Sequence, residues 1–222
     1  RYWHMRLGVD GFRIIGSGGL LYAVRTDLFL SECVLLGDDF GGDSFHAGTV
    51  QAVSDAGRRI IRYNDGFMEA GRHFLRGDED SIGGFVDRET RHECGHPVVN
   101  FMADQNCLSL MDMVSYERRH NEYNGENNMD GRRYNISFNC GAEVKTKREI
   151  VLRERKKMVK NALAMVFLSA SVPMLIAGDE LGMSHGGNNN PYCHDNEINY
   201  IDWGLLEKNS DLYEFTRRLI QF

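Results

Sequence analysis

Residues 149–177 read EIVLRERKKMVKNALAMVFLSASVPMLIA, an amphipathic segment followed by a short apolar run. The apolar pairs recur at nearly helical spacing, which predicts a helix over residues 149–169. The run at 173–177 has the length and composition of a buried strand. Similar runs rich in β-branched residues lie upstream, at 9–15, 33–36, 59–63 and 98–103. Strands separated by helix-length segments predict an α/β fold with a parallel sheet.

The composition is that of an ordinary globular protein, with 222 residues of which 42% are apolar and 26% are charged. These proportions exclude a disordered chain, a collagen and a disulfide scaffold. Lys and Arg number 26 against 32 Asp and Glu, so the net charge is −6, which argues against a nucleic-acid partner. No repeat or linker interrupts the sequence, so we expect residues 1–222 to form part of one domain.

The cysteines predict no disulfide framework, because their number is odd and no pair has CxxC spacing. His92 and His96 flank Cys94 in RHECGHP, but no second pair supports a metal site, so we expect no metal or other cofactor. The longest apolar stretch, 162–177, is shorter than the ~20 residues of a spanning helix. With no signal peptide at its start, the chain is expected to be cytoplasmic, without a membrane partner.

Two long polar loops, 120–140 and 182–203, are rich in Asn and Gly. Loops of this length are usually functional or disordered, and the aromatic residues within these two favour ordered, functional loops. Asp179 and Glu180 follow the apolar run 173–177 directly. They could act on a ligand at the end of a strand or cap the next turn, and the sequence leaves both interpretations open.

Seven segments of the chain are informative through their order and spacing. They are VDGFRI (9–14), VVNFMAD (98–104), LMDMVSY (110–116), NEYNGENNMDG (121–131), FNCGAE (138–143), VPMLIAGDELG (172–182) and GNNNPYCHDNEINYIDW (187–203). In order and spacing they resemble glycogen debranching enzymes, the isoamylase and pullulanase-type branch of the α-amylase superfamily. The resemblance extends over nearly the whole chain, and its last segment is typical of that branch.

This resemblance implies a (β/α)8 barrel with its active site at the carboxyl ends of the strands. Residues 1–222 would be the C-terminal portion of that catalytic domain, a partial TIM barrel with strands four to eight. The first three strands and any flanking modules would belong to a longer protein. Because a partial barrel exposes sheet edges and half of its core, we do not expect these residues to be stable alone.

The family's catalytic carboxylates have no counterparts at the matching positions. Retaining glycosidases need a carboxylate nucleophile and a carboxylic acid on either side of the scissile bond. By the resemblance, the nucleophile position is occupied by Ile15 and the acid position by Gly37, while the His-Asp pair of strand seven reads Gln105 and Asn106. These vestigial positions cannot supply the negative charge that stabilises the transition state. We therefore expect that hydrolysis by the family mechanism has been lost.

Glucan binding is a separate matter, because sugars are held by planar polar groups and aromatic platforms. The candidates are Arg13, Tyr63, Asn64, Gln105, Asn106, Asn189, Asn190 and Tyr192. The leading hypothesis is a glucan-binding or regulatory barrel in α-glucan metabolism, with glycogen or a branched maltooligosaccharide as partner. One alternative is an active α-1,6-glucosidase or glucanotransferase with relocated carboxylates, from the pool Asp38, Asp39, Asp104 and Asp179. The other is an inactive scaffold for an active debranching subunit.

Overall fold

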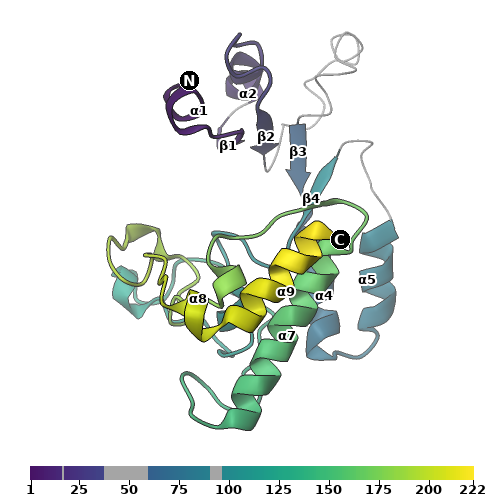
Figure 1. The fold of residues 1–222 in the computed structure, drawn as a ribbon, viewed down its shortest axis with the longest axis vertical. Helices are drawn as coiled ribbons and strands as arrows, with labels where there is room; N and C mark the ends of the chain where they lie inside the picture. Colours follow the sequence, from purple (N-terminus) through teal and green to yellow (C-terminus); the bar gives the residue numbers. More distant parts are fainter. Residues whose placement is uncertain (17, 38–59, 91–96) are drawn as a thin grey trace. The chain divides into compact units, whose positions relative to one another are not determined.

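The structure, a computed structural model, describes residues 1–16, 18–37, 60–90 and 97–222 (Figure 1). The chain divides into two compact units. The first comprises Arg1–Asn64 and Arg91–Val99, and the second comprises Asp65–Thr90 and Asn100–Phe222. The candidate acids Asp38 and Asp39 and the motif with His92, Cys94 and His96 lie outside the described residues.

Parallel strands organise the first unit. Its elements are α1 (Tyr2–Leu7), β1 (Gly11–Ile14), α2 (Gly18–Arg25), β2 (Val34–Gly37), β3 (Ile60–Tyr63) and the first residues of β4 (Val98–Asn100). Each strand pairs in parallel with the next one along the chain, β1 with β2, β2 with β3 and β3 with β4. Their carboxyl ends therefore lie along one edge of the sheet, where parallel α/β folds place their ligands.

Helices packed around an apolar core organise the second unit. Its elements are α4 (Asp65–Arg76), α5 (Ser81–Thr90), α6 (Leu110–Met113), α7 (Glu149–Phe167), β5 (Val172–Pro173), α8 (Leu205–Lys208) and α9 (Ser210–Gln221), with 3₁₀ turns at Glu122–Asn124, Asp179–Leu181 and Pro191–Cys193. Figure 1 shows α9 beside α7, and Leu212 of α9 joins Val159, Leu163 and Val166 of α7 in the core. The buried side chains of α7 follow the helical period that the sequence predicts.

The observed elements agree closely with the sequence predictions. The predicted helix 149–169 is α7, and the upstream runs correspond to β1, β2, β3 and β4. The run at 173–177 forms a much shorter strand, because only Val172–Pro173 is extended. At this point the Met174 N–H donates to the Asn100 carbonyl of β4 over 2.9 Å, which makes β5 the neighbour of β4. The α/β fold with a parallel sheet is confirmed.

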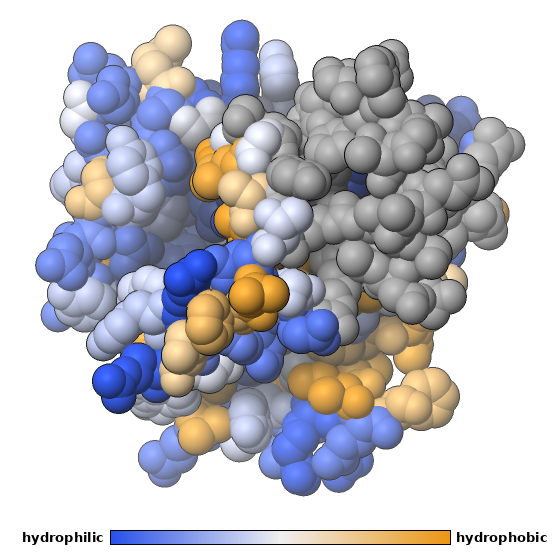
Figure 2. All heavy atoms as spheres, turned by 90° about the horizontal axis from the view of Figure 1, so that it is seen from above, coloured by the Kyte–Doolittle hydropathy of each residue, from blue (hydrophilic) through white to orange (hydrophobic). Residues whose placement is uncertain are grey.

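On the face drawn in Figure 2, most of the coloured residues are hydrophilic, and apolar residues lie among them in small groups. None of the helices in the described part of the chain is long and apolar enough to cross a membrane.

Candidate functional site

The carboxyl end of β1 carries the position that the sequence resemblance assigns to the family nucleophile. Arg13 lies within β1, and Ile15 follows the strand directly. The Ile15 side chain is 74% exposed, so an aliphatic group occupies an accessible place at the strand end. Such a group can neither attack an anomeric carbon nor stabilise a developing positive charge.

The sheet register decides which β2 position faces the same side as Ile15. Ile14 lies beside Gly37, and Arg13 lies beside Leu36. Side chains alternate between the two faces of a strand, so Leu36 shares the face of Arg13 and Ile15, whereas a side chain at position 37 would point to the other face. Neither Leu36 nor Gly37 is acidic. The described end of β2 therefore presents no carboxylate on either face.

Arg13 and Tyr63 come together, as two residues of a shared sugar site must. The Arg13 guanidinium lies over the Tyr63 ring at 5.2 Å from its centroid. The register explains the contact: Arg13, Leu36 and Ile61 stand in one row across the sheet, and Tyr63 lies two residues beyond Ile61 on the same face. Asn64 follows directly, and its N–H donates to the Val99 carbonyl over 3.1 Å. A guanidinium beside an aromatic ring is a pair of groups of the kind that sugar sites use, a polar donor and an aromatic surface.

In the second unit, Gln105 and Asn106 lie together in an exposed turn after β4. The Asn106 N–H donates to Asp104 Oδ1 over 2.9 Å, which fixes the turn. Asp104 itself is buried, with 7% of its surface exposed. The amide side chains therefore stand where a ligand can reach them, while the neighbouring carboxylate has a structural contact.

No sequence pattern points to Arg72, the residue that holds this turn in place. Arg72 of α4 is completely buried, and its guanidinium donates to the carbonyls of Met102, Leu108 and Asn135 over 2.5–3.0 Å. Two of these carbonyls flank the 104–107 turn in sequence. Arginines in amphipathic helices are usually exposed, so only the tertiary structure reveals this role.

The two Asn-rich loops are ordered and bound to each other by side-chain amides. The Asn121 amide donates to Asn189 Oδ1 over 2.9 Å, and the Asn189 N–H donates back to Asn121 Oδ1 over 3.0 Å. Asn189 Nδ2 also donates to the Arg132 carbonyl and to Asn135 Oδ1. Gly131, at φ +70°, allows the close approach, since a Cβ there would stand 2.2 Å from Asn189 Oδ1.

Asn190 belongs to the same network, because its Nδ2 donates to Asp130 Oδ2 over 2.9 Å. Asn189 is completely buried, so its hydrogen-bonding capacity is used within the protein. Tyr192, by contrast, is 79% exposed. Among the candidate residues on this loop, Tyr192 therefore has the exposure needed for stacking on a sugar ring.

Replacing Asn189 with alanine is expected to lower the free energy of unfolding by about 3 kcal/mol, because three partners, two of them buried, lose their hydrogen bonds. Urea unfolding of the intact protein measures this change. The matched control is Asn161→Ala on the exposed side of α7, which we expect to change stability by less than about 0.5 kcal/mol. Equal effects of the two substitutions would contradict a structural role for Asn189.

Asp179 makes a contact other than the cap of the next turn that the sequence offered as one interpretation. Its Oδ1 accepts the Leu110 N–H over 2.9 Å, at the start of α6, and the residue is 2% exposed. Burial raises the pKa of its carboxyl to about 7, despite the opposing effects of the Leu110 N–H and the Arg72 charge. Its hydrogen bond with Leu110 connects the loop that follows β5 to the start of α6.

Comparisons with known proteins agree with this architecture. No protein-family model matches the sequence. The chain is 32% identical over 241 residues to a "Glycogen operon protein GlgX homolog" of Mycobacterium bovis, which covers 98% of this chain and 33% of the relative. It is 35% identical over 265 residues to a chloroplastic isoamylase of Zea mays, covering 100% and 33%. It is 32% identical over 235 residues to a glycogen debranching enzyme of Serratia proteamaculans, covering 96% and 35%.

Solved structures of pullulanases share the fold. A pullulanase mutant from Paenibacillus barengoltzii, complexed with maltotetraose, superposes with a TM-score of 0.65 at 19% identity, covering 99% of this chain and 34% of that one. A type I pullulanase from Bacillus subtilis, complexed with maltose, gives 0.64 at 18% identity, covering 99% and 31%. The predicted fold, part of a (β/α)8 barrel, is confirmed.

The chain spans about a third of the length of these curated relatives. The matches extend over nearly all of its residues, and the parallel sheet agrees with the partial barrel that the resemblance implies. By sequence, the chain therefore belongs to the GlgX, isoamylase and pullulanase-type family of the α-amylase superfamily.

Proposed function

We propose that the protein binds α-glucans without hydrolysing them and serves as a binding or regulatory member of α-glucan metabolism, in the cytoplasm. The observation that carries this proposal is the exposed aliphatic side chain of Ile15 at the end of β1, two residues after Arg13, which contacts the Tyr63 ring. In this proposal the Arg13 guanidinium and the Tyr63 ring contact the sugar, and Ile15 stands in place of the nucleophile. Pullulanases with the same fold are complexed with maltotriose and maltotetraose, which supports an α-glucan as ligand.

The alternative is an active enzyme with relocated carboxylates, and the described geometry reduces the number of candidate carboxylates for it. Asp179 is buried against α6, and buried Asp104 accepts a turn N–H, so both have structural contacts that a catalytic role would have to break. Asp38 and Asp39, which lie outside the described residues, remain the pair to test for that alternative.

The test compares binding with turnover in the full-length protein. We expect it to bind glycogen in affinity electrophoresis while releasing no more reducing ends from glycogen and pullulan than a boiled control. Arg13→Ala should weaken glycogen binding about tenfold, since it removes hydrogen bonds from a charged donor. Arg6→Ala, which removes an equal charge from the exposed surface of α1, should leave binding unchanged.

Two outcomes would overturn the proposal. Turnover that disappears in Asp38→Ala or Asp39→Ala would show an active enzyme with relocated carboxylates. A folded protein with no affinity for glycogen would leave the scaffold hypothesis, in which the barrel supports an active debranching subunit.

A further inference from the structure

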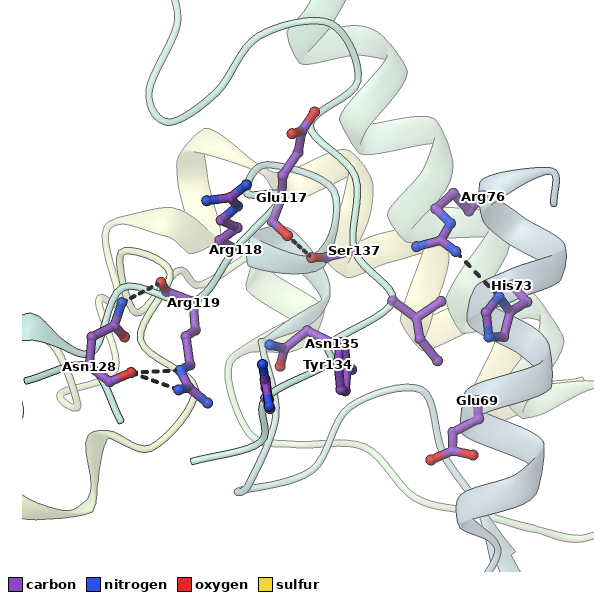
Figure 3. Close-up of a pocket in the computed structure, with 12 residues that line it drawn as sticks. Glu69, His73, Arg76, Glu117, Arg118, Arg119, Asn128, Tyr134, Asn135 and Ser137 are labelled. Carbon is purple, nitrogen blue, oxygen red and sulfur yellow. Dashed lines mark hydrogen bonds between the residues drawn. The ribbon is translucent and has the colours of Figure 1, made fainter. Parts of the chain in front are cut away.

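A cavity of about 890 Å³ lies in the second unit, within the size range of small-molecule sites. It is formed by α4 and by the segments 117–119 and 133–137 (Figure 3). In that view Glu69, His73 and Arg76 lie along α4 on one side, Arg118 and Arg119 lie on the other, and Tyr134 and Asn135 stand between them. None of the candidate glucan-binding residues lines this cavity.

The cavity is cationic although the whole chain carries a net charge of −6. Arg118 and Arg133 form no hydrogen bond or ion pair with any of the described residues. The Arg133 guanidinium carbon lies 5.4 Å from the centroid of the Tyr134 ring. Arg119 donates only to the backbone carbonyls of Asn128 and Gly131, so its charge also has no carboxylate partner in the described chain.

The other charged groups of the cavity are largely compensated. Arg76 is paired with Asp78 over 2.5 Å, and the Arg76 and His73 side chains lower the pKa of Asp78 to about 2. Glu69 is paired with Arg132 over 3.4 Å. Glu117 accepts a hydrogen bond from the Asn139 amide over 2.9 Å. Three guanidinium groups without carboxylate partners therefore share the cavity with a single uncompensated carboxylate, that of Glu117.

Hydrogen bonds within the protein hold the cavity lining in place. The Arg72 guanidinium donates to the Asn135 carbonyl over 2.7 Å, and Asn189 Nδ2 donates to Asn135 Oδ1 over 2.8 Å. The Ser137 hydroxyl donates to the Glu117 carbonyl, which joins the two arginine-bearing segments. Between them Ile136 adopts φ +49°, a left-handed conformation that is rare for a β-branched residue. A rigid frame is what a binding site needs in order to keep its charged groups in place.

From these observations we infer that the cavity binds a hexose phosphomonoester. Guanidinium forks match phosphate oxygens, and a phosphomonoester carries nearly two negative charges, close to the local excess of positive charge. Tyr134 is 74% exposed and offers an aromatic surface to a sugar ring. The carboxylates of Glu69 and Glu117 accept hydrogen bonds from hydroxyl groups and repel longer polyphosphates. The phosphate can belong to a free hexose phosphate or to an ester on a glucan chain.

Titration calorimetry on the intact protein at low ionic strength tests this inference, with glucose 6-phosphate, phosphorylated maltodextrin, unphosphorylated maltodextrin and inorganic phosphate as probes. We expect at least one of the two phosphorylated sugars to bind saturably, and whichever binds identifies the source. Inorganic phosphate and unphosphorylated maltodextrin should each bind at least about tenfold more weakly, because the first lacks the sugar and the second lacks the phosphate.

Arg118→Ala and Arg133→Ala should each weaken binding of the phosphorylated sugar about tenfold. Both side chains are exposed, so the variants should remain folded, which circular dichroism checks. The matched control is Arg153→Ala, an exposed arginine of α7 outside the cavity, which should bind as the parent does. Arg13→Ala should also leave this affinity unchanged, which separates the inference from the proposed function.

Three results would overturn the inference. In the first, neither phosphorylated sugar binds. In the second, the sugar binds equally well with and without its phosphate, which would make the arginines irrelevant. In the third, inorganic phosphate binds as tightly as the hexose phosphate, which would reveal a plain anion site.

Discussion

Replacement of Arg72 with methionine is expected to lower the free energy of unfolding by about 4 kcal/mol. Methionine fills a similar volume, so the loss reflects the hydrogen bonds rather than a cavity. The carbonyls of Met102, Leu108 and Asn135 would all be left buried without this donor. Each buried unsatisfied carbonyl costs about 1–3 kcal/mol.

Urea unfolding of the intact protein, with the midpoint and slope compared between variants, measures this loss. Arg72→Lys should recover only part of it, since an ammonium cannot present the planar fork that spans these carbonyls. The control Arg153→Ala should shift stability by less than about 0.5 kcal/mol. A loss below about 1 kcal/mol for Arg72→Met would show that the guanidinium does not hold the turn that carries Gln105 and Asn106.

The second large effect concerns Asp179 and depends on pH. Burial raises the pKa of this carboxyl from 3.8 to about 7. In the unfolded chain the carboxyl loses its proton near pH 4, so between pH 4 and 7 the folded state holds a proton that the unfolded state has lost. Stability from this group is therefore fully present below about pH 4, falls as the pH rises, and is lost above about pH 7.

Asp179→Asn removes this dependence, because the amide stays neutral and its oxygen still accepts the Leu110 N–H. At pH 8 the variant is expected to be more stable than the parent by up to about 4 kcal/mol, and at pH 4 the two should be nearly equal. Chemical unfolding across this pH range gives the difference curve, which cancels the contribution of other buried groups such as Asp112. Glu207→Gln, an exposed carboxylate of α8, should give a flat difference curve. A flat curve for Asp179→Asn would contradict the buried carboxyl.

The elements of this protein were largely readable from its sequence, because local periodicity reports which residues face a core. The apolar spacing of residues 149–169 predicted α7, and the β-branched runs predicted β1 to β4. The replacement of the family nucleophile by Ile15 stays a prediction from the sequence alone, because it rests on the alignment of the VDGFRI motif. The predicted strand at residues 173–177 was too long, since apolar composition alone does not show where strand pairing ends.

The partners of polar side chains were decided only by the tertiary structure. Asn189 looked like a sugar ligand in a polar loop, but it is buried among amides more than fifty residues away in sequence. Gly37 matched the acid position by alignment, yet the sheet register turns that position away from the face of Ile15. Arg72 and the cationic cavity of Arg118 and Arg133 had no sequence signal at all. The hydrophobic periodicity of a sequence determines which side chains are buried. The partner of a charged or polar side chain depends on contacts between distant segments, which exist only after the chain has folded.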